Sequence, residues 1–263
     1  MPRVYAHRGL SALAPENTLA AYRACADHGV TWFECDVDIL KDGTAVMIHD
    51  STLDRTTDHT GPVSDLTAAD LARVDAGSWF GPEFAGEPIP TLAQTIDLMN
   101  EYQLNANIEL KPVLLGGAAA DQLVSEVVHQ LDRLDRARSV IFSSFDPRLL
   151  ARLRTQLARR RPNWRSRARA SLHRTQPPLG FLFEAGKWAR LWLPIGAWVH
   201  ASAMHPYDDD VTPAVVRRYR RAGFQVNVWT VNSVERAREL AYWGVNGIFT
   251  DRAHEMPEAW LEL

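Results

Sequence analysis

VTWFECDVDIL, residues 30–40, is the stretch that decides the fold, because an apolar run ends there in two carboxylates. The run has the length and composition of a buried parallel strand. Three other apolar runs end in comparable polar signatures: His7-Arg8-Gly9, His49-Asp50 and Glu109-Leu110-Lys111. We interpret all four runs as parallel strands, whose carboxyl ends meet at one rim. Carboxylates and basic groups gathered at one rim indicate metal-assisted chemistry on a phosphate ester.

Strand-like and helix-like segments alternate along the chain, which predicts a TIM (β/α)₈ barrel. The turn at Lys41-Asp42-Gly43 predicts that Thr44–His49 returns as a further short strand. The eight predicted barrel strands are Val4–Ala6, Trp32–Ile39, Asn107–Leu110, Val140–Ser143, Gly180–Phe183, Ala197–Ala201, Gln225–Thr230 and Gly247–Thr250. The predicted helices are Asn17–His28, Leu92–Tyr102, Ala118–Leu134, Arg148–Ala158, Pro213–Ala222 and Ser233–Tyr242.

Two segments are longer than a minimal barrel needs. Residues 51–90 are too long for an ordinary loop, so we interpret them as a small subdomain. It would be inserted after the second barrel strand of a single domain, residues 1–263, and would roof the active site. Arg159–Arg174 holds seven arginines, and we interpret it as a solvated surface loop. A patch for a polyanion or an anionic membrane is the alternative.

Composition restricts the class of protein. The chain has 263 residues, 46% of them hydrophobic, and a net charge of −3. This balance favours neither nucleic-acid binding nor stable membrane association, and the first residues show no secretory signal. Cys25 and Cys35 are expected to be reduced thiols of a cytoplasmic protein. The oligomeric state stays open.

The carboxylates are candidate metal ligands. Glu34 and Asp36 point to the same face of their strand because strand side chains alternate. Together with Glu109 they offer oxygen ligands, which suit Mg²⁺ or Ca²⁺ better than zinc. The alternative is that Arg8 or Lys111 neutralises these carboxylates by ion pairing.

The two histidines are candidate acid–base groups. Cleavage of a phosphodiester needs one proton removed from the nucleophile and one delivered to the leaving alcohol, and histidine does both near neutral pH. His7 and His49 are placed for these roles. Arg8 and Lys111 are expected to bind the phosphate oxygens.

The ordered motifs resemble one family, the glycerophosphodiester phosphodiesterases, and are most similar to its small cytosolic bacterial members. The motifs are AHRG at 6–9, APENT at 14–18, ExD at 34–36, KDG at 41–43, HD at 49–50, RVDAGSW at 73–79, IPTL at 89–92, NIELKP at 107–112, SSFD at 143–146, VWTVN at 228–232 and GVNGIFTD at 244–251. In this order they span nearly the whole chain.

The resemblance implies a TIM barrel that hydrolyses glycerophosphodiesters to sn-glycerol 3-phosphate and an alcohol such as choline or ethanolamine. It implies that the metal ligands, the acid–base pair and the phosphate contacts are the candidates named above. It also implies that Trp229 lines the substrate pocket. The same resemblance implies that Glu16 and Asn17 support the loop of His7 and Arg8.

Several alternatives stay open. Trp79, Phe80, Phe84, Trp188 and Trp192 would supply an apolar groove if the protein were a lysophospholipase D-type enzyme or a phospholipase D-like lyase. A non-catalytic barrel that binds a phosphorylated ligand is a different class. The sequence does not say which histidine is the acid, or whether water or a glycerol hydroxyl attacks first. His200 and His205 would lie either in the pocket or in the protein core.

Overall fold

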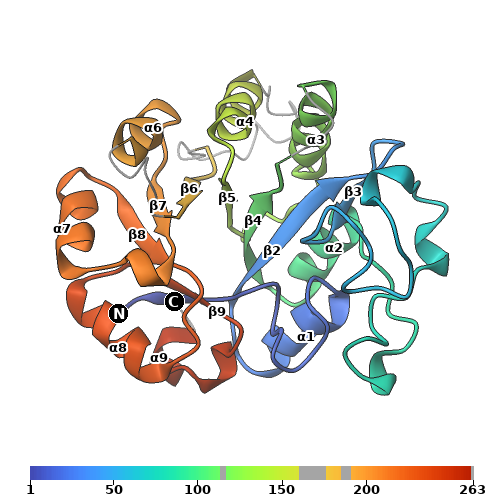
Figure 1. Cartoon of the computed structure of the whole chain (residues 1–263), viewed down its shortest axis with the longest axis horizontal. Coiled ribbons are helices and arrows are strands. Elements are labelled where there is room, and N and C mark those ends of the chain that lie inside the picture. Colours follow the sequence, from blue (N-terminus) through green and yellow to red (C-terminus); the bar gives the residue numbers. More distant parts are fainter. Residues whose placement is uncertain (113–116, 160–175, 185–190, 262–263) are drawn as a thin grey trace.

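The computed structural model describes residues 1–112, 117–159, 176–184 and 191–261. Parallel strands form a closed ring with helices around it, as predicted (Figure 1). The strand order is β1-β9-β8-β7-β6-β5-β4-β2, and pairing of β1 with β2 closes the ring. The barrel strands are β1 (Arg3–Ala6), β2 (Trp32–Ile39), β4 (Asn105–Leu110), β5 (Val140–Ser144), β6 (Leu179–Phe183), β7 (Ala203–Pro206), β8 (Gln225–Val228) and β9 (Gly247–Thr250).

All six predicted helices are present, with bounds close to those expected. The helices of the described residues are α1 Leu19–Asp27, α2 Leu92–Glu101, α3 Gly117–Gln130, α4 Pro147–Arg159, α6 Trp192–Trp198, α7 Pro213–Arg221, α8 Val234–Trp243 and α9 Glu258–Leu261. Of these, α6 and α9 were not predicted. Hydroxyl side chains fix several starts. Thr18 accepts a hydrogen bond from Ala21 N, and Thr91 forms a capping box with Gln94. These contacts satisfy backbone donors of the first turn that have no partner within the helix.

Two strand predictions are wrong. The run Ala197–Ala201 is not a strand, since residues up to Trp198 form α6 and the barrel strand is β7, which pairs Ala203 with Gly180. An apolar run this short does not distinguish helix from strand by periodicity. The predicted short strand after the turn at Lys41-Asp42-Gly43 is present as β3 (Ala45–Met47), but it pairs antiparallel with β2 outside the ring, so the interpretation of the run before His49 as a parallel strand is wrong. His49 therefore follows an edge strand and not a strand of the barrel.

Side chains of the barrel strands divide between two environments. Outward-facing residues such as Cys35 and Ile108 belong to the main core cluster, in which they lie together with apolar side chains of the surrounding helices. Tyr5, Trp32, Ile141 and Phe249 form a separate cluster inside the ring. Because strand side chains alternate, Glu34 and Asp36 follow Trp32 on the inner face. The apolar cluster thus fills the barrel below the carboxylates.

Residues 51–90 lie to one side of the barrel, beside β3 and α2 (Figure 1). Within them are three short 3₁₀ turns, η1 (Val63–Asp65), η2 (Leu71–Arg73) and η3 (Pro82–Phe84). Their apolar side chains form a small cluster with residues of the β2–β3 hairpin: Leu40, Val46, Ile48, Leu53, Val63, Leu71, Val74, Ala76 and Ile89. This segment therefore packs as an extension of the β3 edge.

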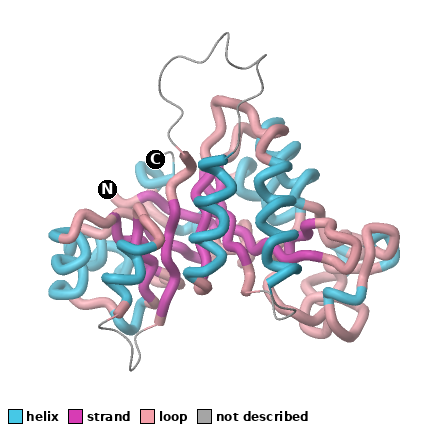
Figure 2. Tube along the Cα trace, turned by 90° about the horizontal axis from the view of Figure 1, so that it is seen from above, coloured by secondary structure: helices cyan, strands magenta, loops and turns pink. Residues whose placement is uncertain are grey.

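The first strand, β1, and the last described helix, α9, lie next to each other (Figure 1). The two ends of the described chain are seen again from above in Figure 2. Thr31 Oγ1 donates to the carbonyl of Leu261 at 2.7 Å near this point. None of the described helices is both long and apolar enough to cross a membrane. Of the predicted arginine-rich segment, Arg159 ends α4 and residues 160–174 lie outside the described residues, as does Trp188.

Candidate active site

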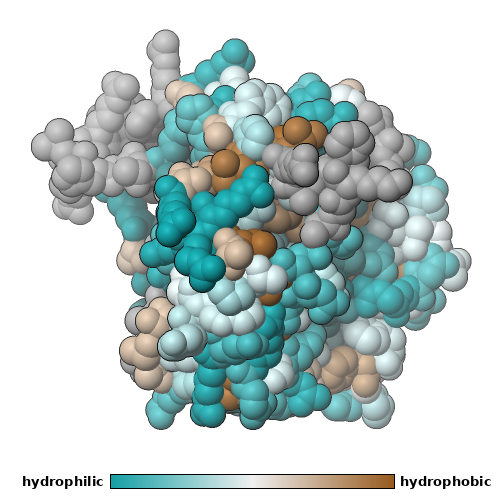
Figure 3. Space-filling view, turned by 60° about the vertical axis from the view of Figure 1, so that its left-hand side comes forward, coloured by the Kyte–Doolittle hydropathy of each residue, from teal (hydrophilic) through white to brown (hydrophobic). Residues whose placement is uncertain are grey.

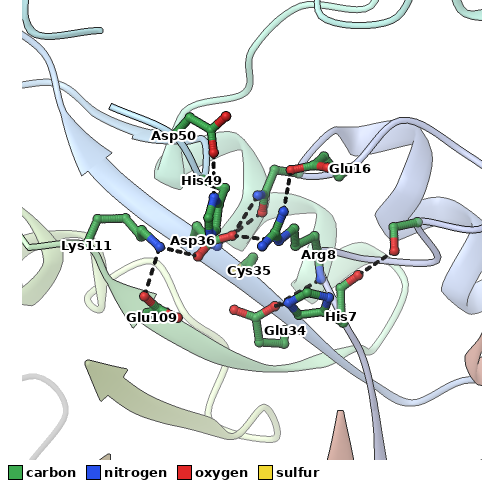
Figure 4. A network of polar contacts seen from close by, with 12 residues as sticks. His7, Arg8, Glu16, Glu34, Cys35, Asp36, His49, Asp50, Glu109 and Lys111 are labelled. Carbon is green, nitrogen blue, oxygen red and sulfur yellow. Dashed lines mark hydrogen bonds and ion pairs between the residues drawn. The ribbon is translucent and has the colours of Figure 1, made fainter. Parts of the chain in front are cut away.

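Three buried carboxylates converge at the carboxyl end of the barrel (Figure 4). The register between β2 and β4 places Asp36 beside Glu109, and Glu34 lies one inward position earlier on β2. One oxygen from each of the three lies within 4.8 Å of the others, and each residue is less than 8% exposed. The predicted ligand set is therefore assembled in space.

The two predicted phosphate-binding groups lie against the same carboxylates. Lys111 Nζ is 3.0 Å from Glu109 Oε1 and 3.3 Å from Asp36 Oδ1. Arg8 Nε is 3.5 Å from Asp36 Oδ2. These cations hold the pKa of Asp36 below its usual range, although burial opposes the shift. The ion-pairing alternative thus describes part of the arrangement.

Glu34 shows that ion pairing does not neutralise the whole cluster. Within the described residues its side chain accepts a backbone hydrogen bond from Arg8 N at 2.9 Å but has no lysine or arginine ion pair. Burial and the charges of Asp36 and Glu109 raise its pKa. Burial also raises the pKa of Glu109 to about 7. Three buried carboxylates facing two cations suit a further cation, and an all-oxygen donor set fits Mg²⁺ or Ca²⁺.

The loop after β1 brings Arg8 to the carboxylates through two left-handed residues. Arg8 has φ 57° and Gly9 has φ 81°. A Cβ at Gly9 would come within 2.7 Å of Ala21 Cβ, so only glycine fits against α1. Asn17 supports the loop, as the resemblance implies, by donating N–H to Arg8 O. Its side chain donates to Asp36 Oδ2 at 2.8 Å.

Each candidate histidine is held by a carboxylate at Nδ1. His7 Nδ1 is 2.7 Å from Asp251 Oδ1, and His49 Nδ1 is 2.6 Å from Asp50 Oδ1. A carboxylate accepts hydrogen bonds, so in each neutral ring the proton sits on Nδ1 and the lone pair on Nε2. His7 Nε2 lies 4.0 Å from Glu34 Oε2. Each histidine therefore keeps Nε2 available for proton transfer.

A pocket opens between the histidines. Its lining combines polar residues with the apolar side chains of Phe145, Leu182, Trp229 and Phe249. Trp229 is fixed there by a hydrogen bond from Nε1 to His205 O at 2.8 Å and by an edge-to-face contact with Phe145. Trp229 therefore lines this pocket, and its contact with a substrate stays a prediction. The space, including its open mouth, is about 360 Å³, which is at the small end for a ligand pocket.

The structure also places the two histidines that the sequence left open. His205 points into the barrel interior, where Nε2 lies 3.0 Å from Asn227 Nδ2 and the ring is fully buried. A Cβ at Gly180 would come within 2.3 Å of this ring, so glycine there makes room for it. His200 is exposed just after α6. Neither histidine lines the pocket.

Four residues of the site were not predicted: Asp50, Arg55, Asn107 and Asp251. Asp50 and Asp251 are the last residues of the motifs HD and GVNGIFTD, but their role as carboxylate partners of the histidines was visible only once the fold was known. Asn107 lies two residues before Glu109 on β4, on the same face, and this spacing was available from the sequence. Arg55 carried no local signal.

The model of the glycerophosphoryl diester phosphodiesterase family matches residues 7–255. A glycerophosphodiester phosphodiesterase of Caldanaerobacter subterraneus subsp. tengcongensis is 32% identical over 248 residues, covering 94% of this chain and 93% of that protein. Human glycerophosphodiester phosphodiesterase 1 is 30% identical over 250 residues, which cover 88% of this chain and 72% of the human protein.

Solved structures show the same fold. An Oleispira antarctica phosphodiesterase in complex with the product sn-glycerol-3-phosphate superposes with a TM-score of 0.85 and 28% identity, covering 97% of this chain and 95% of that one. A putative glycerophosphoryl diester phosphodiesterase from Silicibacter pomeroyi superposes with a TM-score of 0.80 and 26% identity. The match covers 96% of this chain and 92% of that one.

Proposed function

The chain belongs to the glycerophosphoryl diester phosphodiesterase family, and we propose that it hydrolyses glycerophosphodiesters with a divalent metal ion and two histidines. The products are sn-glycerol 3-phosphate and an alcohol; the first is the ligand of the Oleispira antarctica structure. The enzyme is a phosphoric diester hydrolase.

One observation carries the mechanistic part of the proposal: two carboxylate-held histidines line a single pocket together with Glu34 and Glu109 of the buried acidic cluster. A barrel that only bound a phosphorylated ligand would need the cations but not two oriented histidines. Glu34, Asp36 and Glu109 would hold Mg²⁺ or Ca²⁺. When bound, such an ion polarises a phosphate oxygen and stabilises charge that develops in the transition state.

The chain's own residues perform the remaining tasks. Arg8 and Lys111 lie beside the acidic cluster and would bind the non-bridging phosphate oxygens. The histidine whose Nε2 faces the nucleophile removes its proton, and the other protonates the departing alcohol oxygen. Asp251 and Asp50 stabilise the imidazolium form of their histidines: the base becomes an imidazolium when it takes the proton, and the acid starts as one and ends neutral. Both water and the glycerol 2-hydroxyl are compatible with this arrangement as first nucleophile.

The lipid-cleaving alternatives find less support. Trp79, Phe80 and Phe84 pack on one another within residues 51–90, and Trp192 packs on Phe181 and Phe183 of β6. None of these four lines the pocket. On the face shown in Figure 3, hydrophobic residues outside the grey atoms form only small areas among hydrophilic ones. We therefore propose a small glycerophosphodiester as the substrate.

Two broader predictions belong to this proposal. Residues 51–90 form an inserted subdomain that flanks the site, since Thr56, Ala76 and Ile89 lie beside Glu16 and His49 around a small cavity. The protein is cytoplasmic, which is consistent with the free thiols of Cys25 and Cys35.

An assay of glycerol 3-phosphate release tests the proposal. Glycerophosphocholine, glycerophosphoethanolamine and lysophosphatidylcholine are supplied in turn, with Mg²⁺ or Ca²⁺. We expect release from the two glycerophosphodiesters. Activity confined to lysophosphatidylcholine, detected as released choline, would support a lysophospholipase D-type enzyme instead. No turnover of any of them under either metal would contradict the proposal.

A further inference from the structure

We propose that Arg55, from the segment between β3 and α2, is a positioning residue that holds His49 and Arg8 in place at the same time. The inference rests on the proposed function, because it assigns Arg55 a part in that reaction. Arg55 touches neither the pocket nor the acidic cluster. It would act through two other carboxylates, Asp50 and Glu16.

The hydrogen bonds of Arg55 join these two carboxylates. Its Nε donates to Asp50 Oδ2 at 2.7 Å, and its Nη2 donates to Asp50 Oδ1 at 3.1 Å. On the other side Nη1 donates to Glu16 Oε2 at 2.7 Å, and Nη2 donates to Glu16 Oε1 at 2.8 Å. One planar guanidinium thus fixes the orientation of both carboxylates, a geometry that lysine cannot reproduce.

Each carboxylate passes this orientation to one site residue. Asp50 Oδ1 is 2.6 Å from Nδ1 of His49, and Glu16 Oε1 accepts from Nη1 of Arg8 at 2.8 Å. An unbroken chain of charge-assisted hydrogen bonds therefore runs from His49 through Arg55 to Arg8. Figure 4 shows the two outer links, Asp50 to His49 and Glu16 to Arg8. We call the three central residues, Asp50, Arg55 and Glu16, the Arg55 clamp.

The fold explains why His49 needs such support and His7 does not. His7 directly follows the barrel strand β1, and its partner Asp251 is also held by Asn232 Nδ2 at 2.6 Å. His49 follows the three-residue edge strand β3. In the described part of the chain, the side-chain oxygens of Asp50 have hydrogen bonds only with His49 and Arg55. Without Arg55, Asp50 is free to turn toward solvent and His49 loses its fixed ring orientation.

The clamp predicts a characteristic pattern of kinetic effects. Asp50→Asn acts through His49 and should mainly lower kcat, whereas Glu16→Gln acts through Arg8 and should mainly raise KM. Arg55→Ala should do both, with kcat/KM reduced by about 10–100-fold, the range typical of residues that orient a group in direct contact with the reaction. Arg55→Lys should recover little of this loss, because a point charge cannot bridge both carboxylates.

The decisive experiment measures the effect of Arg55→Ala on kcat and KM in two backgrounds, the wild-type enzyme and the Asp50→Asn, Glu16→Gln double variant. Arg73→Ala is measured alongside as a control. Arg73 lies in the same segment, is 74% exposed and pairs with Asp70, so its variant controls for loss of a surface ion pair. In the Asp50→Asn, Glu16→Gln double variant, adding Arg55→Ala should cause no further loss, because Arg55 then has no carboxylate to orient. Thermal unfolding of every variant is recorded.

The outcomes separate the clamp from the proposed function. If wild type releases no glycerol 3-phosphate, the proposed function fails. Suppose that wild type is active. If Arg55→Ala or Arg55→Lys then folds and keeps kcat/KM within twofold of the wild-type value, the clamp is overturned. It is also overturned if Arg55→Ala causes its full loss in the double-variant background, since Arg55 would then act by another route. Should Arg55→Ala not fold, Arg55→Lys, which keeps the charge, gives the same comparison.

Discussion

Asp251 Oδ1 lies 2.7 Å from Nδ1 of His7, although the two residues are separated by 244 positions in the chain. The contact forms because β9 pairs with β1 in the barrel, so the segments that follow these two strands lie side by side. Asp251 is further held by Asn232 and Ser11. Burial opposes its ionisation, but the hydrogen bond to His7 lowers the pKa of Asp251 to about 2. Asp251 is thus a fixed anion that orients the His7 ring.

Asp251→Asn should therefore impair catalysis with little effect on folding. An amide can present its NH₂ group to Nδ1 and so favour the wrong tautomer, with the proton on Nε2. We expect kcat to fall about 10–100-fold. The measurement is steady-state turnover of glycerophosphocholine, and Asp209→Asn, at an exposed carboxylate of the loop after β7, is the control. An Asp251→Asn enzyme with wild-type kcat would show that the contact is only structural.

The two histidines should each be essential for turnover. General acid–base groups contribute about 10²–10⁴-fold, so His7→Ala and His49→Ala should each lower kcat by that factor. Circular dichroism should show that both variants remain folded. His200→Asn is the control, because His200 is exposed and has φ 55°, which asparagine tolerates. Near-normal turnover by either alanine variant would exclude that histidine from the acid–base pair.

Chelation should abolish activity, and the acidic cluster should account for the effect. We expect EDTA to stop glycerol 3-phosphate release and Mg²⁺ or Ca²⁺ to restore it. We expect weaker metal binding in each of the variants Glu34→Gln, Asp36→Asn and Glu109→Gln. Each variant removes one of three anionic oxygen ligands, which lie within 4.8 Å of one another. Isothermal titration with each metal, in the absence of substrate, measures this separately from turnover. Full activity after exhaustive chelation would contradict the metal assignment.

Much of this arrangement followed from the sequence because it depends on local patterns. The inner-face spacing of Glu34 and Asp36 needs only the alternation of a strand, and Glu109 needs only the parallel neighbour that β4 provides. The polar signatures at strand ends therefore identified the cluster. Seven of the eight predicted barrel strands coincide with or overlap the observed ones, since their apolar runs are bounded by clear turns or helix caps.

The failures have equally physical causes. The β7 strand contains His205 and Pro206, so its composition resembles a loop, and only pairing with β6 makes it a strand. The position of β3 outside the ring depends on barrel closure between β1 and β2, which no local pattern encodes. Asp251 lies 244 positions from its partner His7, and only the pairing of β1 with β9 brings the two together. Arg55 is only six positions from His49, but it acts on that histidine through Asp50, which the sequence does not show.

The buried ring of His205 should make stability depend on pH. Burial lowers its pKa from 6.5 to about 3 in the folded protein, so below pH 6.5 the unfolded chain binds a proton that the folded chain does not. The contribution to stability is thus complete above pH 6.5 and is lost as the pH falls toward 3. Within this window the free energy of unfolding should decrease by up to about 1.4 kcal/mol per pH unit from this group.

The variant His205→Gln tests this dependence. The quantity compared is the slope of the free energy of unfolding against pH, and not the stability at any one pH. Glutamine keeps a polar group near Asn227 but cannot titrate, so its stability should fall less steeply between pH 6.5 and 4.5 than that of wild type. Urea unfolding at several pH values measures both slopes. His129→Gln, at an exposed histidine of α3, should retain the wild-type slope. Parallel slopes for wild type and His205→Gln would show that His205 does not resist protonation in the folded protein.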